Sequence, residues 1–472
     1  MIGLRDYQLE VLADVRSALR HHDRVLLQLP TGAGKTKTAI YMLAGAITKG
    51  KRTWFTCHRT ELVDQTSAAL EEAGLDHGFC AAGKPPRYSR AITVCSVDTL
   101  RGRMDRLPEP DFIVVDEAHH STAGTWRKIF EHYPRAKFVG LSATPERLDG
   151  RGLDELFTSL VVGPSTAELI EEGYLSNYKL LSQPRGDFSG IKMRGADYDA
   201  KEMTAALDKP HILGDAVQTF RETCPHAQAV VFCVSVEHAL HVRDAFKAAG
   251  FVAEELDGGA DRRTRIEVMR AFRQKRIQIL TSVDLFGEGT DIPELDAVIL
   301  LRPTKSLGLY LQQVGRALRV VYAPGHDLST REGRLAAIAA GNKPTAYILD
   351  HVGNFHEHGS PHTPREWTLQ GRAKRGRKSS APVKTCGTCF GTVPAAATEC
   401  PYCHAGFEGQ PREVEQVEGR LVEIDVSLFR RQQKQEVGQA KTREELERIA
   451  AQRGYKPAWV EHILKARQRK AG

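Results

Sequence analysis

Short, continuous apolar runs alternate with amphipathic stretches along the first 165 residues of the chain. The runs cover residues 25–29, 52–57, 91–96, 111–116 and 137–142. Runs of this length and composition are typical of strands that are buried on both faces of a parallel sheet. The amphipathic stretches between them predict helices, so this part of the sequence predicts successive strand–helix–strand units.

The same alternation returns after a break at residues 166–210, where the pattern aligns with no predicted element. Further apolar runs cover residues 229–234, 251–256, 278–283, 297–302 and 346–350, and the segment 322–343 interrupts the last crossover. We therefore predict an α/β protein in which two similar parallel-sheet domains follow one another along the chain.

The order of these patterns divides the chain into six segments. They are a first domain (1–165), a connecting segment (166–210), a second domain (211–355), a basic linker (356–382), a four-cysteine module (383–408) and a charged tail (409–472). The linker is expected to be flexible, because residues 365–378 carry six basic side chains and one acid. The tail contains one stretch with a helical pattern, at residues 441–454.

The composition of the 472 residues is that of an ordinary globular protein with a mild excess of base. The net charge of +7 fits a polyanionic partner but does not require one. No run approaches 18 apolar residues and the N-terminus lacks a secretory pattern, so we expect a cytoplasmic protein without a membrane partner. The nine cysteines are five scattered residues and one cluster of four, which indicates a reduced chain with a metal site.

A glycine-rich stretch, GAGKT, follows the first apolar run and precedes a predicted helix. In this context the backbone amides of residues 32–36 would face phosphate groups at the helix N-terminus. Lys35 would add a cation, the Thr36 hydroxyl would bind Mg²⁺, and Gly32 and Gly34 would bind the phosphates through their backbone amides. The chain departs from the common pattern at its first position, where Leu29 replaces a glycine.

An acidic pair ends the fourth apolar run. Asp116 would lie at the carboxyl edge of the sheet beside the glycine-rich loop, where a carboxylate can hold Mg²⁺. Glu117, next to it, could polarise the attacking water. An ordinary acidic strand end is the alternative, and the presence of GAGKT upstream favours the metal site.

Three further motifs carry a resemblance to a known family. The stretches DEAH (116–119), SATP (142–145) and QQVGRALR (312–319) resemble the ordered motifs of superfamily 2 helicases. The chain is most similar to the group of type III restriction subunits and Rad-type repair motors, including bacterial RadD-like and phage helicases. The resemblance covers residues 3–355 and implies two RecA-like domains that hydrolyse ATP with Mg²⁺.

The resemblance also implies a role for individual residues. Gln8 would contact the adenine base, while Arg59 and Thr99 would hold the nucleic-acid backbone. His119, Ser142 and Thr144 would couple hydrolysis to domain movement. The remaining implied residues contact the nucleotide or its γ-phosphate and are Gly289, Asp291, Gln312, Arg316 and Arg319.

The two arginines have a physical rationale that is independent of the resemblance. Phosphoryl transfer needs positive charge where charge builds on the γ-phosphate. If Arg316 and Arg319 lie on the second domain, the site is complete only when the domains close, and repeated closure on a strand is a motor step. The alternative is that these arginines form surface salt bridges on a helix.

Four cysteines near the C-terminus form two C-x-x-C pairs separated by ten residues. Four thiolates close a tetrahedral site, which favours structural Zn²⁺ over a redox dithiol. The predicted ribbon could bind nucleic acid or a protein partner, as could the tail, or it could be an inert spacer. The ligands would be Cys386, Cys389, Cys400 and Cys403.

The favoured function is an ATP-dependent helicase or translocase that acts on DNA rather than RNA in repair, recombination or phage replication. One alternative is the motor subunit of a restriction system, although no D/E-x-K nuclease motif follows Lys384. Another is a partner-dependent remodelling ATPase that does not separate strands. A small-molecule kinase fits least, because it leaves the second-domain arginines unexplained.

Overall fold

The computed structural model describes most of the chain up to residue 371 and short pieces beyond it. The described residues are 3–120, 123–147, 150–183, 188, 191–194, 197–208, 210–283, 295–371, 383–385, 392–394, 422–424, 440, 442–453, 460 and 464. They belong to two compact units, one formed by residues 1–371 with 420–472 and the other by residues 372–419. Within the described residues, no helix is long and apolar enough to cross a membrane.

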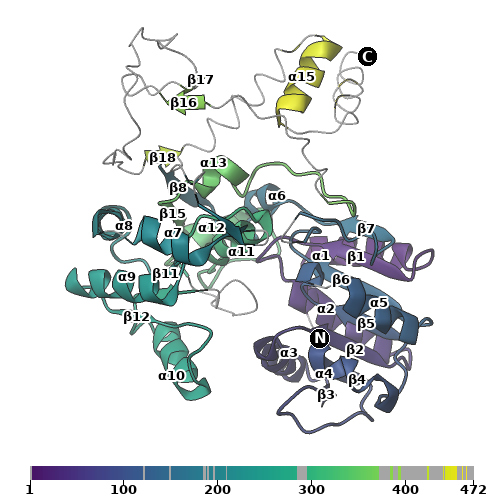
Figure 1. Ribbon diagram of the computed structural model, residues 1–472. Coiled ribbons are helices and arrows are strands. Elements are labelled where there is room, and N and C mark those ends of the chain that lie inside the picture. The colour runs from purple at the N-terminus through teal and green to yellow at the C-terminus, as the bar shows by residue number, and fades with distance from the viewer. Residues whose placement is uncertain are drawn as a thin grey trace. The chain divides into compact units, whose positions relative to one another are not determined.

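The first sheet is parallel throughout, and Figure 1 shows its strands in the order β3-β4-β2-β5-β6-β1-β7. Its strands are β1 (Arg24–Gln28), β2 (Thr53–Cys57), β3 (His77–Cys80), β4 (Ile92–Ser96), β5 (Phe112–Val115), β6 (Lys137–Ser142) and β7 (Ser159–Val162). Every residue of β2 and β5 is buried, as the continuous apolar runs predicted.

Helices cover both faces of the first sheet. They are α1 (Asp6–Ala18), α2 (Lys35–Ile47), α3 (Thr60–Glu72), α4 (Val97–Arg101), α5 (Ala123–His132) and α6 (Thr166–Glu171), with the short helices η1 (Met104–Arg106) and η2 (Ala118–His120). Alternate residues of β1 divide between the two faces. Val25 and Leu27 share a core with α1 and α2, whereas Leu26 packs with Trp126 of α5.

The second sheet has the strand order β12-β13-β11-β14-β15-β8-β18 and is parallel except at β18, which pairs antiparallel with β8. Its strands are β8 (Tyr178–Ser182), β11 (Ala229–Phe232), β12 (Ala253–Glu255), β13 (Ile279–Ser282), β14 (Ala297–Leu300), β15 (Ala346–Asp350) and β18 (Val422–Ile424). An α/β fold with two parallel sheets is therefore confirmed.

The helices of the second sheet also lie on both of its faces. They are α7 (Ala200–Leu207), α8 (Pro210–Thr223), α9 (Val236–Ala248), α10 (Arg262–Arg273), α11 (Leu307–Ala317), α12 (Arg331–Ala340) and α13 (Asn354–His358). Helices α8 and α9 pack together on one face, where Phe220 and Phe246 are in contact. The other face is covered by α11, whose Tyr310 and Val314 are fully buried.

The remaining elements are small. A hairpin of β9 (Met193–Arg194) and β10 (Asp197–Tyr198) lies in the predicted connecting segment, and α15 (Arg443–Arg453) lies in the tail. In the second unit, β16 (Val383–Thr385) pairs antiparallel with β17 (Thr392–Pro394). The predicted zinc ligands and the predicted nucleotide contacts Gly289 and Asp291 lie outside the described residues.

Residues 361–371 return from the second sheet to the first. The backbone N–H groups of Leu153 and Asp154 both donate to the carbonyl of Leu369, at 2.6 and 3.1 Å, and Gly371 forms a β-bridge with Arg151. Leu369 also packs against the core beneath α5. This part of the segment for which the sequence predicts a flexible linker therefore makes regular contacts with the first domain.

A buried carboxylate organises the junction of β8, β15 and α13. Asp350 is fully buried and accepts hydrogen bonds from the Ser182 hydroxyl at 3.0 Å and from the backbone N–H groups of Asn354 at 3.1 Å and Phe355 at 2.8 Å. Burial raises the pKa of Asp350, and these donors oppose that rise. The carboxylate thus fixes the start of α13 against two strands.

We predict that Asp350→Ala strongly destabilises the second domain. The substitution leaves several buried donors without an acceptor, which should lower the free energy of unfolding by about 2–4 kcal/mol. Urea unfolding followed by circular dichroism measures this loss. Glu332→Ala is the control, because its side chain is 81% exposed and its ion pair with Arg331 is loose at 4.0 Å. Equal midpoints for both variants would contradict the assigned role.

Candidate functional site

The loop between β1 and α2 depends on two glycines with left-handed backbones. Gly32 has φ +87° and Gly34 has φ +79°, a backbone region that residues with a Cβ atom rarely adopt. Gly34 is the residue that precedes Lys35, the first residue of α2. The turn therefore leaves the amides of the first turn of α2 without intrahelical partners, as an anion-binding helix N-terminus requires.

Gln8 holds this loop from the side of α1. Its amide nitrogen lies 3.2 Å from the Ala33 carbonyl, 3.3 Å from the Gly34 carbonyl and 3.2 Å from the Thr38 hydroxyl. Its amide oxygen accepts from the backbone N–H of Arg5 at 3.0 Å, and the side chain is 1% exposed. Gln8 therefore lies at the loop, and a contact with a base would share an amide that already binds the loop backbone.

The acidic pair lies at the end of β5, close to the lysine of the loop. The Lys35 ammonium lies 3.9 Å from a Glu117 carboxylate oxygen and 3.5 Å from the Leu29 carbonyl. Glu117 has φ +44°, which is unusual for a residue with a side chain and occurs often at functional sites. Its backbone N–H donates to the Asp116 carboxylate at 3.0 Å.

Asp116 has the properties of a cation ligand. Its carboxylate is buried, and burial, followed by the charge of Glu117, raises its pKa to about 7, while Lys35 opposes the rise. A divalent cation would favour the charged form of such a group. Thr36 is exposed in the first turn of α2, and α2 packs against β5. A carboxylate and a hydroxyl are oxygen donors that suit Mg²⁺, so these residues fit the ion.

A chain of hydrogen bonds joins the acidic pair to α11 of the second sheet. The Ser142 hydroxyl donates to the Thr144 carbonyl at 2.5 Å, so its oxygen accepts the hydrogen bond from His119 Nδ1 at 2.9 Å. His119 then carries its proton on Nδ1, and its Nε2 accepts from the Gln312 amide at 3.1 Å. His119 Nδ1 also lies 3.4 Å from Glu117. Buried polar groups from both sheets therefore meet beside Glu117.

The second sheet also brings arginines to the loop. Arg316 lies one turn after Gln312 on α11 and is 6% exposed, and Arg319 follows the end of that helix. Burial lowers the pKa of Arg319. A Cβ atom added to Gly32 would lie 3.6 Å from Arg319 Cγ, so the stem of this arginine lies against the loop. Among the described residues, Gln312 and Arg319 of the second domain therefore lie beside predicted residues of the first domain.

The two predicted nucleic-acid contacts lie at the same edge of the first sheet. Arg59 immediately precedes α3, two residues after β2 ends, and Thr99 lies in α4, which follows β4. Both residues are half-buried, and β2 and β4 are parallel neighbours. This edge also bears Asp116, so the predicted nucleic-acid contacts and the acidic pair share one side of the sheet.

A pocket that the sequence did not indicate adjoins Asp116. It has a volume of about 210 Å³, and His58 and His120 stack on one another there with ring centroids 4.7 Å apart. The other residues that line it are Val97, Asp98, Arg101, Thr125 and Trp126. Among the described residues, no cluster of three or more histidine, cysteine or acidic side chains could hold a metal ion.

Two parts of the chain match known protein families. Residues 1–147 match the family described as "Type III restriction enzyme, res subunit", and residues 208–321 match "Helicase conserved C-terminal domain". A 51.5 kDa protein of a Lactococcus phage (isolate 7-9) is 31% identical over 385 residues, which are 81% of this chain and 78% of the phage protein.

More distant proteins share the same two-domain region. IRC3 of Saccharomyces cerevisiae, a protein assigned as an ATP-dependent helicase, is 27% identical over 68% of this chain and 50% of its own length, so the match spans half of the yeast protein. A structure assigned as a fragment of an HsdR subunit of a type I restriction enzyme from Vibrio vulnificus aligns with a TM-score of 0.56 and 22% identity. The alignment covers 75% of this chain and 65% of that one, which shows a common fold.

We predict that Gly315→Ala prevents the contact between α11 and the glycine-rich loop. The added Cβ atom would lie 2.5 Å from Thr31 Cβ, and such overpacking costs about 1–3 kcal/mol. If turnover requires this contact, nucleotide hydrolysis should fall about tenfold or more. Gly45→Ala in α2 is the control, because no atom lies within 4 Å of its added Cβ. Equal rates for the two variants would contradict a requirement for the contact.

Proposed function

The chain belongs to superfamily 2 of the helicases, in the group that includes the type III restriction subunit, and we propose that it is an ATP-dependent motor that moves along DNA. It is an ATP hydrolase of the helicase type. The observation that carries the proposal is the hydrogen bond between Gln312 and His119, residues that are 193 positions apart and lie on different sheets. It supports a site that both domains must complete.

Each residue of the site has a proposed part in hydrolysis. Bound ATP with Mg²⁺ supplies the phosphoryl group, and Thr36 and Asp116 would hold the metal ion. Lys35 would move from Glu117 and the Leu29 carbonyl to the phosphates, where its charge is better neutralised. Glu117, released from this ion pair, would accept a hydrogen bond from the attacking water.

The second domain would contribute charge and sense the reaction. Arg316 and Arg319 would stabilise the negative charge on the γ-phosphate. The His119 bonds to Gln312 and Ser142 would transmit a change at Glu117 to α11, because the direction of each hydrogen bond is fixed. Loss of the γ-phosphate would then weaken the contact between the domains, and a strand bound across both would be moved.

The choice of DNA, and a role in repair, recombination or phage replication, extend this proposal. The match to a restriction enzyme subunit supports DNA over RNA. The same match favours one alternative, the motor subunit of a restriction system, with its nuclease on another chain. A second alternative is a remodelling ATPase that depends on a partner. The described cysteines are free and buried, which supports a reducing, cytoplasmic compartment.

We also propose that Cys386, Cys389, Cys400 and Cys403 bind one structural Zn²⁺ ion. The support is the spacing of the two C-x-x-C pairs. In so small a module the metal would provide much of the folding free energy. The resulting ribbon, together with the tail, is a candidate surface for nucleic acid or a protein partner.

The decisive test is ATP hydrolysis by the full chain with and without nucleic acid at fixed salt. We expect strong stimulation by single-stranded, duplex or forked DNA and less by RNA. Strand separation of the forked substrate distinguishes a helicase from a translocase. Hydrolysis that no nucleic acid stimulates would favour the partner-dependent ATPase over the motor.

Lys35→Ala and Glu117→Gln test the site itself. Each removes a charged group that acts on the transition state, so turnover should fall about 100-fold or more while thermal melting stays unchanged. Lys37→Ala is the matched control, since Lys37 is an exposed lysine on the same helix. Normal hydrolysis by a folded Lys35→Ala or Glu117→Gln protein would disprove these assignments.

For the metal, we predict about one zinc ion per purified chain. Cys386→Ser and Cys403→Ser should each lose it, because a closed four-thiolate site tolerates no missing ligand. Cys224→Ser, which changes a buried cysteine outside the cluster, should retain it. Elemental analysis by mass spectrometry measures the content, and a zinc-free wild-type chain would reject the site.

A further inference from the structure

The segment 322–343, which interrupts the last crossover of the second domain, contains a buried arginine. Arg334 of α12 is 4% exposed, and its guanidinium donates to the Glu172 carbonyl at 2.7 Å and to the carbonyls of Leu328 at 3.2 Å and Ser329 at 3.1 Å. It also lies 3.3 Å from the Glu172 carboxylate. A guanidinium that is so fully hydrogen-bonded is held in one position.

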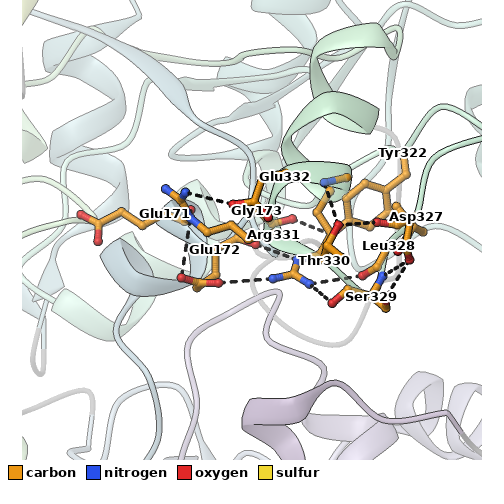
Figure 2. A network of polar contacts seen from close by, with 12 residues as sticks. Glu171, Glu172, Gly173, Tyr322, Asp327, Leu328, Ser329, Thr330, Arg331 and Glu332 are labelled. Atoms are coloured by element: carbon orange, nitrogen blue, oxygen red, sulfur yellow. Dashed lines mark hydrogen bonds and ion pairs between the residues drawn. The ribbon is translucent and has the colours of Figure 1, made fainter.

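The same segment contacts Gly173, the residue after Glu172, through both Tyr322 and Arg334. The Tyr322 hydroxyl donates to the Gly173 carbonyl at 2.5 Å, and Figure 2 shows Glu172 and Gly173 beside residues of the segment. A Cβ atom added to Gly173 would lie 3.1 Å from Arg334 Cβ, so the backbones approach closely there. Residues 172–173 are therefore fixed by α12 and the loop before it.

The next residue, Tyr174, receives the charge of Arg334 on its ring. The guanidinium carbon of Arg334 lies 4.0 Å from the ring centroid, well within the range of a cation–π interaction. Arg5 lies 5.0 Å from the same centroid. Tyr174 is 8% exposed, so both interactions are largely protected from water.

Tyr174 in turn contacts the element that holds the glycine-rich loop. Its ring meets the Tyr7 ring edge-on with centroids 5.0 Å apart, and the Tyr7 hydroxyl donates to the Ala33 carbonyl at 2.8 Å. Arg5, beside the ring, donates its backbone N–H to the Gln8 amide. A continuous set of contacts therefore runs from Arg334 through Tyr174 to the loop and to Gln8.

We propose that Arg334 is a positioning residue for the nucleotide base. It holds Tyr174 against Arg5 and Tyr7, and this fixes the orientation in which the Gln8 amide meets the base. Selection of adenine then depends on a segment of the second domain that does not itself touch the nucleotide. The inference rests on the proposed function, in which Gln8 contacts the base.

Disturbing Arg334 should reduce the selectivity for the base more than it reduces the binding of the phosphates. A base is discriminated by hydrogen bonds whose donors and acceptors have fixed directions, and an amide that reorients can serve several bases. Lys35 and the helix N-terminus contact phosphates that all nucleoside triphosphates share. Disturbing Arg334 should therefore weaken ATP binding while changing CTP binding little.

The test is the equilibrium binding of ATP and of CTP, each with Mg²⁺, to the full chain by calorimetry. We expect Arg334→Ala to raise the Kd for ATP about tenfold and to lower the ATP-to-CTP preference by a similar factor. Tyr174→Leu should have the same effect, because it removes the ring that Arg334 contacts. This variant replaces Arg334→Ala in the test if Arg334→Ala does not fold. Tyr174→Phe should behave as the wild type, because it keeps the ring.

Arg331→Ala is the matched control. Arg331 lies on the same helix and contacts the Glu171 carbonyl and the Glu172 carboxylate, but it does not lie over Tyr174. Unchanged ATP preference in folded Arg334→Ala and Tyr174→Leu proteins would overturn the inference, as would equal losses of ATP and CTP. Failure of the proposed function differs, because the wild type would then bind ATP without hydrolysing it or would not bind it.

Discussion

The close packing of the glycine-rich turn is the constraint on which the rest of the site depends. A Cβ atom on Gly34 would lie 2.6 Å from the Gln8 amide nitrogen, and one on Gly32 would lie 2.9 Å from Leu175. The turn is therefore enclosed by α1 on one side and by the connection between the domains on the other. Because Gln8 and Leu175 lie this close to the backbone of the two glycines, the loop keeps its shape only while these segments stay in place.

The hydrogen bonds through the buried His119 side chain join the first domain to α11 of the second domain. Ser142 commits its proton to Thr144, which leaves its oxygen to accept from His119, and the other ring nitrogen then accepts from Gln312. A buried group that loses its partner carries a free-energy cost of about 1–3 kcal/mol. Separation of the domains therefore has a free-energy cost at His119, beside Glu117, and this cost would be a physical basis for the proposed coupling of hydrolysis to movement.

The C-terminal part of the chain is attached to this machinery at two places. Residues 369–371 pair with residues 151–154 of the first domain, and β18 adds an antiparallel strand to the second sheet beside β8. The four-cysteine module lies in the sequence between these attachments, in the unit of residues 372–419. A partner that binds the module would thus act on a segment that is preceded by a contact with the first domain and followed by a strand of the second sheet.

The sequence by itself determined the features that depend on local physics. Continuous apolar runs predicted ten strands of the two sheets, and GAGKT predicted a glycine-rich loop that leads into a helix, which the structure shows as α2. It did not predict β3, β7, β8 or β18, because the edge strands β3, β7 and β18 are short and only partly apolar and β8 lies in the segment where the pattern breaks.

Only the tertiary structure decided which distant residues meet. Gln312 contacts His119, Gly315 approaches Thr31 and Arg334 lies over the Tyr174 ring. In each pair, the strands β8 and β11 to β14 lie between the two residues in the sequence. Neither member of such a pair has a local pattern that marks its partner. The contact exists because two independently patterned domains pack against each other, and periodicity along one chain carries no information about that packing.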